Sequence, residues 1–219
     1  MTSTTMAVMR TIVVASQKGG AGKTSLLRNV AVAAAAEREG VVMLDADPQG
    51  SLTRWYSVRD RDVPGLVRLD GRPIPDLIVG LREAGAGLVF VDTPPAASPF
   101  TGELITLADL VVLPVQATPD DLGAIGPTLD LVEAAGKPFA FVLSRVKYKS
   151  RLAAEARRVL GEHGRVAQVE LSDLVDYPLA ATRGLAVGEL APEGKAATEV
   201  RELWRFIERL LDARRRKAS

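Results

Sequence analysis

Short apolar runs alternate along the chain with longer segments of helical periodicity. Between the apolar runs, hydrophobic residues recur at the spacing of one helix face. The alternation of strands and helices predicts βαβ units, so we expect an α/β fold with a doubly wound, mostly parallel sheet and helices on both faces. The runs predicted as strands, rich in β-branched and aromatic residues, are 11–16, 41–45, 88–92, 110–115, 139–144 and 166–170.

Capping residues mark the expected ends of two helices. A first helix is predicted over residues 24–39 and stops at Gly40, a residue suited to a left-handed C-cap. A later helix is predicted to begin with Thr118 as N-cap and Pro119 at the first helical position. Asp120 and Asp121 then fall in the first turn, where the helix dipole favours negative charge.

The last helix, expected over residues 195–212, is amphipathic. A stripe of this kind covers the sheet in a globular domain, or it inserts into a membrane surface. We favour the first use, because a single domain of this length needs the helix to bury its sheet. The stripe consists of Val200, Leu203, Trp204, Ile207, Leu210 and Leu211.

The junction between the first strand and the first helix carries a phosphate-binding loop. Its glycines lack Cβ atoms, so several backbone N–H groups can point at one anion beside the helix N-terminus. By the pattern G-x-x-x-x-G-K-[ST], Lys23 lies against the β- and γ-phosphates and Thr24 ligates Mg²⁺ directly. This chain has Gln17 where that pattern has its first glycine. The predicted ATP-binding residues are Lys18, Gly19, Gly20, Ala21, Gly22, Lys23, Thr24 and Ser25.

A dinucleotide-binding turn is one alternative for this loop, and a solvated glycine-rich turn is another. Residues 20–25 form a weak G-x-G-x-x-G, and Asp45 follows about twenty residues later. Lys23 and Thr24 argue against the first alternative, because a dinucleotide site needs a third small residue for close packing. The order of strand, loop and helix argues against the second.

The Lys-Gly-Gly-x-Gly-Lys-Thr loop resembles the deviant Walker A motif of the ParA/MinD ATPases. The resemblance implies that Lys18 reaches the nucleotide of a partner subunit when two monomers enclose two ATP molecules. It also implies a homodimer that binds DNA without sequence preference and hydrolyses ATP when a small centromere-binding or cargo adaptor protein stimulates it. We therefore expect a small ParA-type partition ATPase, without the N-terminal DNA-binding domain of longer members, that segregates plasmid or other cargo.

Two acidic sites follow predicted strands, at the edge where open α/β sheets bind their ligands. Alternation of side chains sends Asp45 and Asp47 toward the same side. The resemblance assigns Asp47 to the attacking water and leaves Asp45 beside the waters of the magnesium, so we take Lys18 and Asp47 as the catalytic residues. A turn in which an Asp side chain caps its own backbone is the structural alternative for residues 45–50.

The second acidic site is Asp92, which ends an apolar strand as in a Walker B motif. A carboxylate in that place would hold Mg²⁺ through water. The Asp-Thr-Pro-Pro segment that begins at Asp92 resembles the second switch segment of the family, a loop that senses the γ-phosphate.

Composition fits a compact enzyme of one domain, with 219 residues, 47% of them hydrophobic and 25% charged. We expect residues 1–10 to be a flexible N-terminus, 11–212 a single P-loop ATPase domain and 213–219 a basic tail. The chain has no cysteine, which excludes iron–sulfur and zinc-thiolate sites. No run of eighteen apolar residues occurs, and we expect a cytoplasmic, nucleoid-associated protein.

Positive charge is concentrated in the last third of the chain. From residue 145 onward 16 Lys and Arg face 11 Asp and Glu, a balance of +5, whereas residues 1–144 carry 12 against 16, or −4. A basic surface of this kind suits the DNA backbone, and a solvated surface is the alternative. No aromatic interleaving is evident, so binding would be sequence-independent. The candidate contacts are Arg145, Lys147, Lys149, Arg151, Arg214, Arg215, Arg216 and Lys217.

Two other functions stay open. A membrane-associated positioning ATPase of the MinD type would need the last helix free to insert, and we regard membrane binding as the less favoured outcome. A biosynthetic ligase or synthetase of the same fold would use the phosphate loop on a small substrate, which Lys18 and the Asp-Pro-Gln segment disfavour. The adenine pocket is unassigned, because residues 170–173 read Glu-Leu-Ser-Asp where larger members commonly have Pro-Arg.

Overall fold

The computed structural model describes residues 9–218, with side chains as far as residue 213. Residues 1–8 of the expected flexible N-terminus lie outside the described residues. Met9 is buried, and Arg10 is already part of the first strand, where its guanidinium pairs with Asp109 at 2.8 Å. The ordered domain therefore begins before residue 11.

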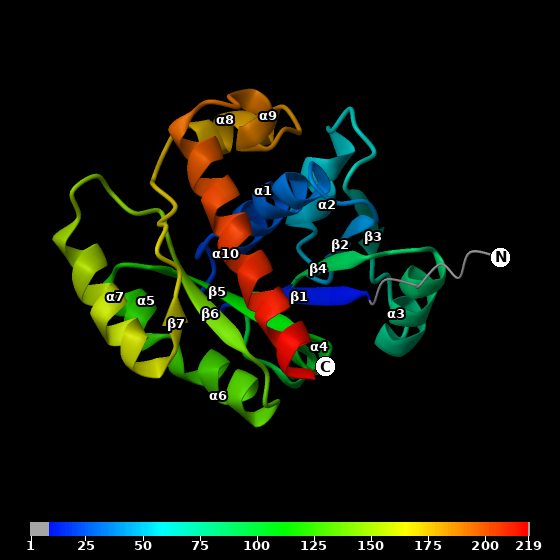
Figure 1. Ribbon diagram of the computed structural model, residues 1–219, viewed down its shortest axis with the longest axis horizontal. Helices are drawn as coiled ribbons and strands as arrows, with labels where there is room; N and C mark the ends of the chain where they lie inside the picture. Colours follow the sequence, from blue (N-terminus) through cyan, green and yellow to red (C-terminus); the bar gives the residue numbers. More distant parts are fainter. Residues whose placement is uncertain (1–8, 219) are drawn as a thin grey trace.

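Within residues 9–218, seven strands form one sheet in the order β3-β2-β4-β1-β5-β6-β7, and every strand pair is parallel. The strand order and the helices on both faces confirm the predicted doubly wound α/β fold (Figure 1). The strands are β1 (Arg10–Val14), β2 (Val41–Asp45), β3 (Gly65–Arg68), β4 (Leu88–Asp92), β5 (Leu110–Gln116), β6 (Phe139–Ser144) and β7 (Arg165–Val166).

The two edge strands differ from the sequence prediction. β3 is a four-residue, partly exposed strand that was not predicted, because a short edge strand lacks the long apolar run of a central one. β7 has two residues instead of the five expected over 166–170. Beyond it only Ala167 and Leu171 still donate backbone hydrogen bonds to β6, each at 2.9 Å.

Helix ends follow the expected caps in part. The Thr118 hydroxyl accepts a hydrogen bond from the Asp121 N–H at 3.2 Å, which confirms that N-cap. α1 ends at Ala35 instead of residue 39, and Gly40, with φ +67°, serves the turn into β2. The helices are α1 (Lys23–Ala35), α2 (Ser51–Ser57), α3 (Ile74–Glu83), α4 (Pro99–Thr106), α5 (Pro119–Gly123), α6 (Gly126–Ala134), α7 (Arg151–His163), α8 (Asp176–Thr182), α9 (Val187–Leu190) and α10 (Lys195–Ala218).

Alternate residues of the central strands supply two apolar layers. Ile12 and Val14 of β1 pack in the layer that contains α1, α2, α8, α9 and α10. Val13 packs in the opposite layer, with α3, α4, α6 and α7. The sheet is therefore covered on both sides, and the loops at the carboxyl ends of its strands are left to form a ligand site.

The apolar stripe of α10 covers the sheet, as we expected. Val200, Leu203, Trp204, Ile207 and Leu211 are buried, while Leu210 is partly exposed. The Trp204 ring lies 6.2 Å from that of Phe90 on β4. Figure 1 shows α10 crossing in front of the strands. Burial of this stripe leaves it unavailable to a membrane in this state.

α10 continues to Ala218 instead of ending at Asp212, so the residues assigned to a basic tail extend the helix backbone. The side chains of Arg214, Arg215, Arg216 and Lys217 lie outside the described residues. Within residues 9–218, none of the helices has the length and apolarity that a membrane span requires.

Candidate nucleotide site

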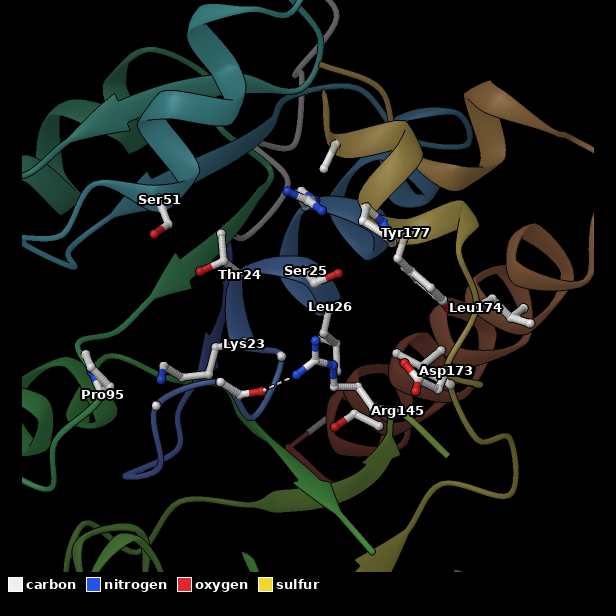
Figure 2. A pocket seen from close by; sticks show the side chains of 18 of the residues that line it. Lys23, Thr24, Ser25, Leu26, Ser51, Pro95, Arg145, Asp173, Leu174 and Tyr177 are labelled. Carbon is white, nitrogen blue, oxygen red and sulfur yellow. Dashed lines mark hydrogen bonds between the residues drawn. The ribbon is translucent and has the colours of Figure 1, made fainter. Parts of the chain in front are cut away.

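A cleft of about 850 Å³ opens at the carboxyl ends of the central strands, with the phosphate loop along its floor (Figure 2). Six of the eight predicted ATP-binding residues line it. Ala21 is buried instead, and Lys18 points elsewhere. The lining residues are Gly19, Gly20, Gly22, Lys23, Thr24, Ser25, Leu26 and Arg28 from the loop and α1, Asp47, Gln49 and Ser51 after β2, Pro95 after β4, Ser144 and Arg145 at the end of β6, residues 171–175, and Tyr177, Pro178 and Ala181 of α8.

The loop conformation requires glycine at two positions. Gly20 and Gly22 have φ of +81° and +92°, a region that other L-residues rarely adopt. Side chains of neighbouring strands hold the loop from behind. Gln116 Nε2 donates to the Gly20 carbonyl at 2.9 Å, and the Ser144 hydroxyl donates to the Ala21 carbonyl at 2.8 Å. These two hydrogen bonds hold the loop backbone in place.

Lys23, Thr24 and Asp92 meet at the start of α1. Lys23 Nζ donates to the Ser16 carbonyl at 3.2 Å, and burial lowers its pKa. The Thr24 hydroxyl donates to Asp92 Oδ2 at 2.6 Å. The other Asp92 oxygen, Oδ1, is buried and has no hydrogen-bond partner among the described residues. Burial, with a smaller contribution from nearby Asp45, raises the pKa of Asp92 to about 7 even though the Thr24 hydrogen bond opposes the shift.

These groups fit a divalent cation. An unpartnered buried carboxylate oxygen beside a threonine hydroxyl is a hard oxygen donor set of the kind Mg²⁺ prefers. Within the part of the chain that the structure describes, no three His, Cys, Asp or Glu side chains gather as a complete metal site. Thr24 and Asp92 would therefore share the ion with nucleotide phosphates and water, which is how Mg²⁺ is usually bound beside a phosphate loop.

Asp45, the last residue of β2, and Asp47, two residues later, make different contacts. Asp45 Oδ2 accepts hydrogen bonds from the Thr53 N–H at 2.8 Å and the Thr53 hydroxyl at 2.5 Å, and Oδ1 accepts from the Asp47 N–H at 3.2 Å. Asp45 thus anchors the start of α2 and does not line the cleft, although it was predicted beside the waters of the magnesium. Asp47 lines the cleft, and its carboxylate accepts from the Gln49 N–H at 2.9 Å. The capping turn is therefore present, and the Asp47 side chain remains available to the cleft.

Lys18 turns away from the cleft of its own subunit. Its Nζ lies 2.5 Å from Asp121 Oδ2 at the start of α5, and the Thr118 hydroxyl donates to the same oxygen at 2.6 Å. The Asp121 side chain is only 3% exposed. The sequence places Asp121 only in the first turn of a helix, because nothing local links it to a lysine 103 residues away.

Arg145 was predicted to contact DNA, but it lines the nucleotide cleft. Its guanidinium donates to the Gly20 carbonyl at 3.4 Å (Figure 2). Lys147, Lys149 and Arg151 remain exposed on the surface of the loop after β6 and the start of α7. Tyr148 lies between Lys147 and Lys149 and is 83% exposed, and the Lys149 Nζ is 5.2 Å from the centre of its ring. An aromatic side chain therefore does interleave this basic cluster, contrary to our expectation.

The comparison with known proteins begins with the family. Residues 12–187 match the family described as CobQ/CobB/MinD/ParA nucleotide binding domain. The chain belongs to this family. It is 37% identical over 213 residues to the maintenance of carboxysome distribution protein A of Gloeobacter kilaueensis. The matched region covers 95% of this chain and 96% of that protein.

Other relatives are matched over different lengths. The protein of the same name from Halothiobacillus neapolitanus is 30% identical over 200 residues, 86% of this chain and 91% of that protein. The chromosome-partitioning ATPase Soj of Thermus thermophilus is 35% identical over 142 residues, 51% of this chain and 56% of that protein.

Solved structures confirm the fold of the family. The cell division ATPase MinD of Pyrococcus furiosus has a TM-score of 0.77 at 20% identity and covers 93% of this chain and 100% of its own. The structure of Cyanthece apo McdA has a TM-score of 0.74 at 17% identity with the same coverage. Both the predicted ParA/MinD resemblance and the predicted fold class are thus confirmed.

Asp92→Asn is expected to stabilise the metal-free, nucleotide-free protein at pH 8. The pKa of Asp92 is about 7 in the folded state against an ordinary 3.8, so the folded state binds the proton more tightly. The contribution of Asp92 to wild-type stability therefore falls as pH rises from about 4 to about 7, by about 1.4 kcal/mol per unit of pKa difference. Asparagine carries no charge and avoids this loss.

Thermal unfolding followed by circular dichroism at pH 5 and pH 8 tests this expectation. The melting temperature of Asp92→Asn should exceed that of wild type by more at pH 8 than at pH 5. Glu103→Gln, which neutralises an exposed carboxylate on α4, should change neither value. A variant that melts below wild type at pH 8 would contradict the burial argument.

Proposed function

We propose that this chain is an ATP-switched positioning ATPase. It binds Mg-ATP in the cleft, dimerises in that state, and hydrolyses ATP when an adaptor protein stimulates it, so that cargo is distributed within the cell. The observation that carries the proposal is the different placement of two lysine side chains of one loop. Lys23 lies in the cleft, whereas Lys18 lies outside it on Asp121, which suits a side chain that serves a partner subunit's nucleotide.

The residues of the cleft have distinct tasks in this proposal. Lys23 and the loop amides neutralise the phosphates. Thr24 directly and Asp92 through water would hold Mg²⁺, which would supply further charge neutralisation on the phosphate oxygens. Asp47 orients the attacking water. Asp45 keeps Asp47 in place through its bond to the Asp47 N–H, which is a positioning role. Asp45 is also the neighbour of Asp92 in the sheet, so its place beside the waters of the magnesium stays a prediction.

The base end of the cleft is proposed to lie between Arg145 and residues 171–174. Arg145 is fixed on the phosphate loop, and Figure 2 shows Asp173 and Leu174 on the same side of the cleft as Arg145. The Ser172 N–H and hydroxyl donate to Glu199 on α10, at 2.9 Å and 2.6 Å, which stabilises this wall.

The lengths over which the relatives match indicate which kind of cargo this chain positions. Proteins named for maintenance of carboxysome distribution are matched almost from end to end, whereas the chromosome-partitioning ATPase is matched over about half of its length. This difference supports positioning of a large cellular assembly over plasmid or chromosome partition. Plasmid partition stays one alternative, and a ligase or synthetase of the same fold stays another.

Duplex DNA is the proposed track for the ATP dimer. Lys147, Lys149 and Arg151 give the loop after β6 an exposed positive surface, and Tyr148 adds a flat side chain among them. Such a surface binds phosphates without reading bases. Arg214 to Lys217 remain candidates from the sequence alone.

Replacing Lys147, Lys149 and Arg151 together by Gln is expected to weaken ATP-dependent DNA binding and flatten its salt dependence. The log–log slope changes by roughly 0.9 for each DNA phosphate that is no longer neutralised. Fluorescence anisotropy with a random duplex at two salt concentrations measures this slope. A matched control neutralises Arg68, Arg72 and Arg82, three exposed arginines around β3 and α3, and should keep the wild-type slope.

The same assay decides between DNA and a membrane. If the wild-type protein with ATP does not bind duplex DNA at low salt but sediments with anionic liposomes, the MinD-like membrane function replaces the one proposed here. Binding to DNA without ATP dependence would also contradict the proposal, because the track must release the protein after hydrolysis.

A further inference from the structure

Arg28 is a positively charged group in the cleft that forms no salt bridge among the described residues, although the carboxylate of Asp92 is near enough to interact with it. It lies on α1 one helical turn beyond Thr24 and lines the cleft. Its Nε is buried without a hydrogen-bond partner, and no described residue forms an ion pair with its guanidinium. The guanidinium lies over the ring of Trp55 on α2, 5.7 Å from the ring centre.

A second arginine, Arg59, contacts the same Trp55 ring and has the carboxylate partner that Arg28 lacks. Arg59 lies 5.2 Å from the Trp55 ring centre, and both of its terminal nitrogens bond to Glu189, at 2.7 Å and 2.8 Å. Arg59 is therefore neutralised, whereas Arg28 is not. A buried charge without a partner is costly, and the cost is usually removed by an ion pair or a ligand. Burial lowers the pKa of Arg28 to about 10, so it remains charged at neutral pH.

Tyr177 supplies a second unpartnered polar group on the wall of the same cleft. Its hydroxyl is buried with no hydrogen-bond partner among the described residues. Burial raises its pKa, so the hydroxyl stays protonated and can donate. Figure 2 shows the cleft continuing from Ser25 toward Tyr177 on α8, beyond the phosphate loop.

We propose that Arg28 and Tyr177 form an oxyanion subsite beside the phosphate loop, which binds a phosphate group that Lys23 and Thr24 do not hold. A guanidinium matches a phosphate through two parallel hydrogen bonds. The subsite is built from α1, α2 and α8, whereas the loop lies between β1 and α1. Free phosphate and the nucleotide's own phosphate chain are the two sources of such a group. The inference needs nucleotide binding but neither DNA binding nor cargo positioning.

The subsite bears on the segment that carries the hydrolytic aspartate. Trp55, the aromatic platform of Arg28, belongs to α2, and α2 begins at Ser51, four residues after Asp47. An anion that binds the Arg28 guanidinium changes the contact between the guanidinium and the Trp55 ring. The fluorescence emission of Trp55 therefore reports whether the subsite is occupied. The other tryptophan, Trp204, is buried against Phe90 in the layer of α10 and does not line the cleft.

The test titrates inorganic phosphate into protein saturated with Mg-ADP, by calorimetry and by tryptophan emission. Wild type should bind phosphate while ADP stays bound, and Arg28→Gln should weaken that binding at least about tenfold, the loss expected for a charge-assisted hydrogen bond. Arg28→Lys should keep part of it, and Tyr177→Phe should weaken it by a smaller factor. Arg38→Gln is the matched control, because Arg38 lies over the other tryptophan, Trp204, at 5.6 Å.

The outcomes separate the two sources. If wild type loaded with ADP ignores phosphate but Arg28→Gln weakens ADP binding itself about tenfold, the oxyanion belongs to the nucleotide. If Arg28→Gln folds and binds both ADP and phosphate as wild type does, the subsite does not exist and Arg28 only packs on Trp55. Failure of wild type to bind ADP would instead count against the proposed function.

Discussion

Lys18→Ala is expected to abolish the ATP-dependent dimer while the monomer still binds nucleotide with near wild-type affinity. The reason is geometric. Lys18 Nζ is bonded to Asp121 and does not line its own cleft, so its removal leaves the contacts of Lys23 and Thr24 untouched. In the proposed dimer, only the phosphates of the partner subunit would lose a charged donor. Gel filtration with ATP measures the dimer, and calorimetry on the monomer measures nucleotide affinity.

Two variants make this test specific. Lys23→Ala should lose nucleotide binding as well as the dimer, because Lys23 lies in the cleft. Asp121→Asn should favour the dimer, since it removes the charge that holds Lys18 in the monomer while keeping an acceptor for the Thr118 hydroxyl. A Lys18→Ala protein that still dimerises with ATP would refute a role for Lys18 in the partner's site.

Asp47→Ala is expected to slow ATP hydrolysis by a factor on the order of a hundred or more, while ATP binding and dimerisation persist. Asp47 lines the cleft and keeps its carboxylate there, whereas Asp45 is engaged by Thr53. Steady-state turnover, with and without an activating partner, measures the effect. The ATP-bound dimer should accumulate, because chemistry is impaired more than binding.

Asp47→Asn separates the water-orienting role from the structural one. Asparagine retains an acceptor for the Gln49 N–H and so preserves the turn, but it lacks the negative charge; it should be nearly as slow as Asp47→Ala. Asp130 is an exposed carboxylate on α6, and the control variant Asp130→Ala should hydrolyse ATP at the wild-type rate. Turnover of Asp47→Ala within a few-fold of wild type would move the role to another carboxylate.

The parts of the site that sequence predicts are those encoded by neighbouring residues. The glycines and Lys23 stand between a strand and a helix, and the loop they form needs the positive φ that only glycine adopts readily. Asp92 follows from an apolar run that ends in a carboxylate. The central strands are predicted well for the same reason, because burial on both faces leaves a continuous apolar signal.

The parts that sequence misses are contacts between distant segments. The Lys18–Asp121 pair spans 103 residues, and Arg145 reaches the loop across 125. A basic cluster after β6 suggested one DNA surface, but the chain reverses through a left-handed Arg145, with φ +51°, and sends that side chain into the cleft. The edge strand β3 was missed because its burial is partial, so its apolar pattern is weak.

Mixing two inactive variants tests the central claim most directly, namely that two subunits share each ATP site. Lys18→Ala and Asp47→Ala are combined as nucleotide-free monomers, ATP is added, and hydrolysis is measured. In a mixed dimer the Lys18→Ala subunit keeps its own Asp47 and receives Lys18 from its partner, so one complete site forms. The account predicts that the mixture hydrolyses ATP well above either variant alone. A mixture no more active than the sum of its parts would show that Lys18 acts within its own subunit, and it would contradict the account.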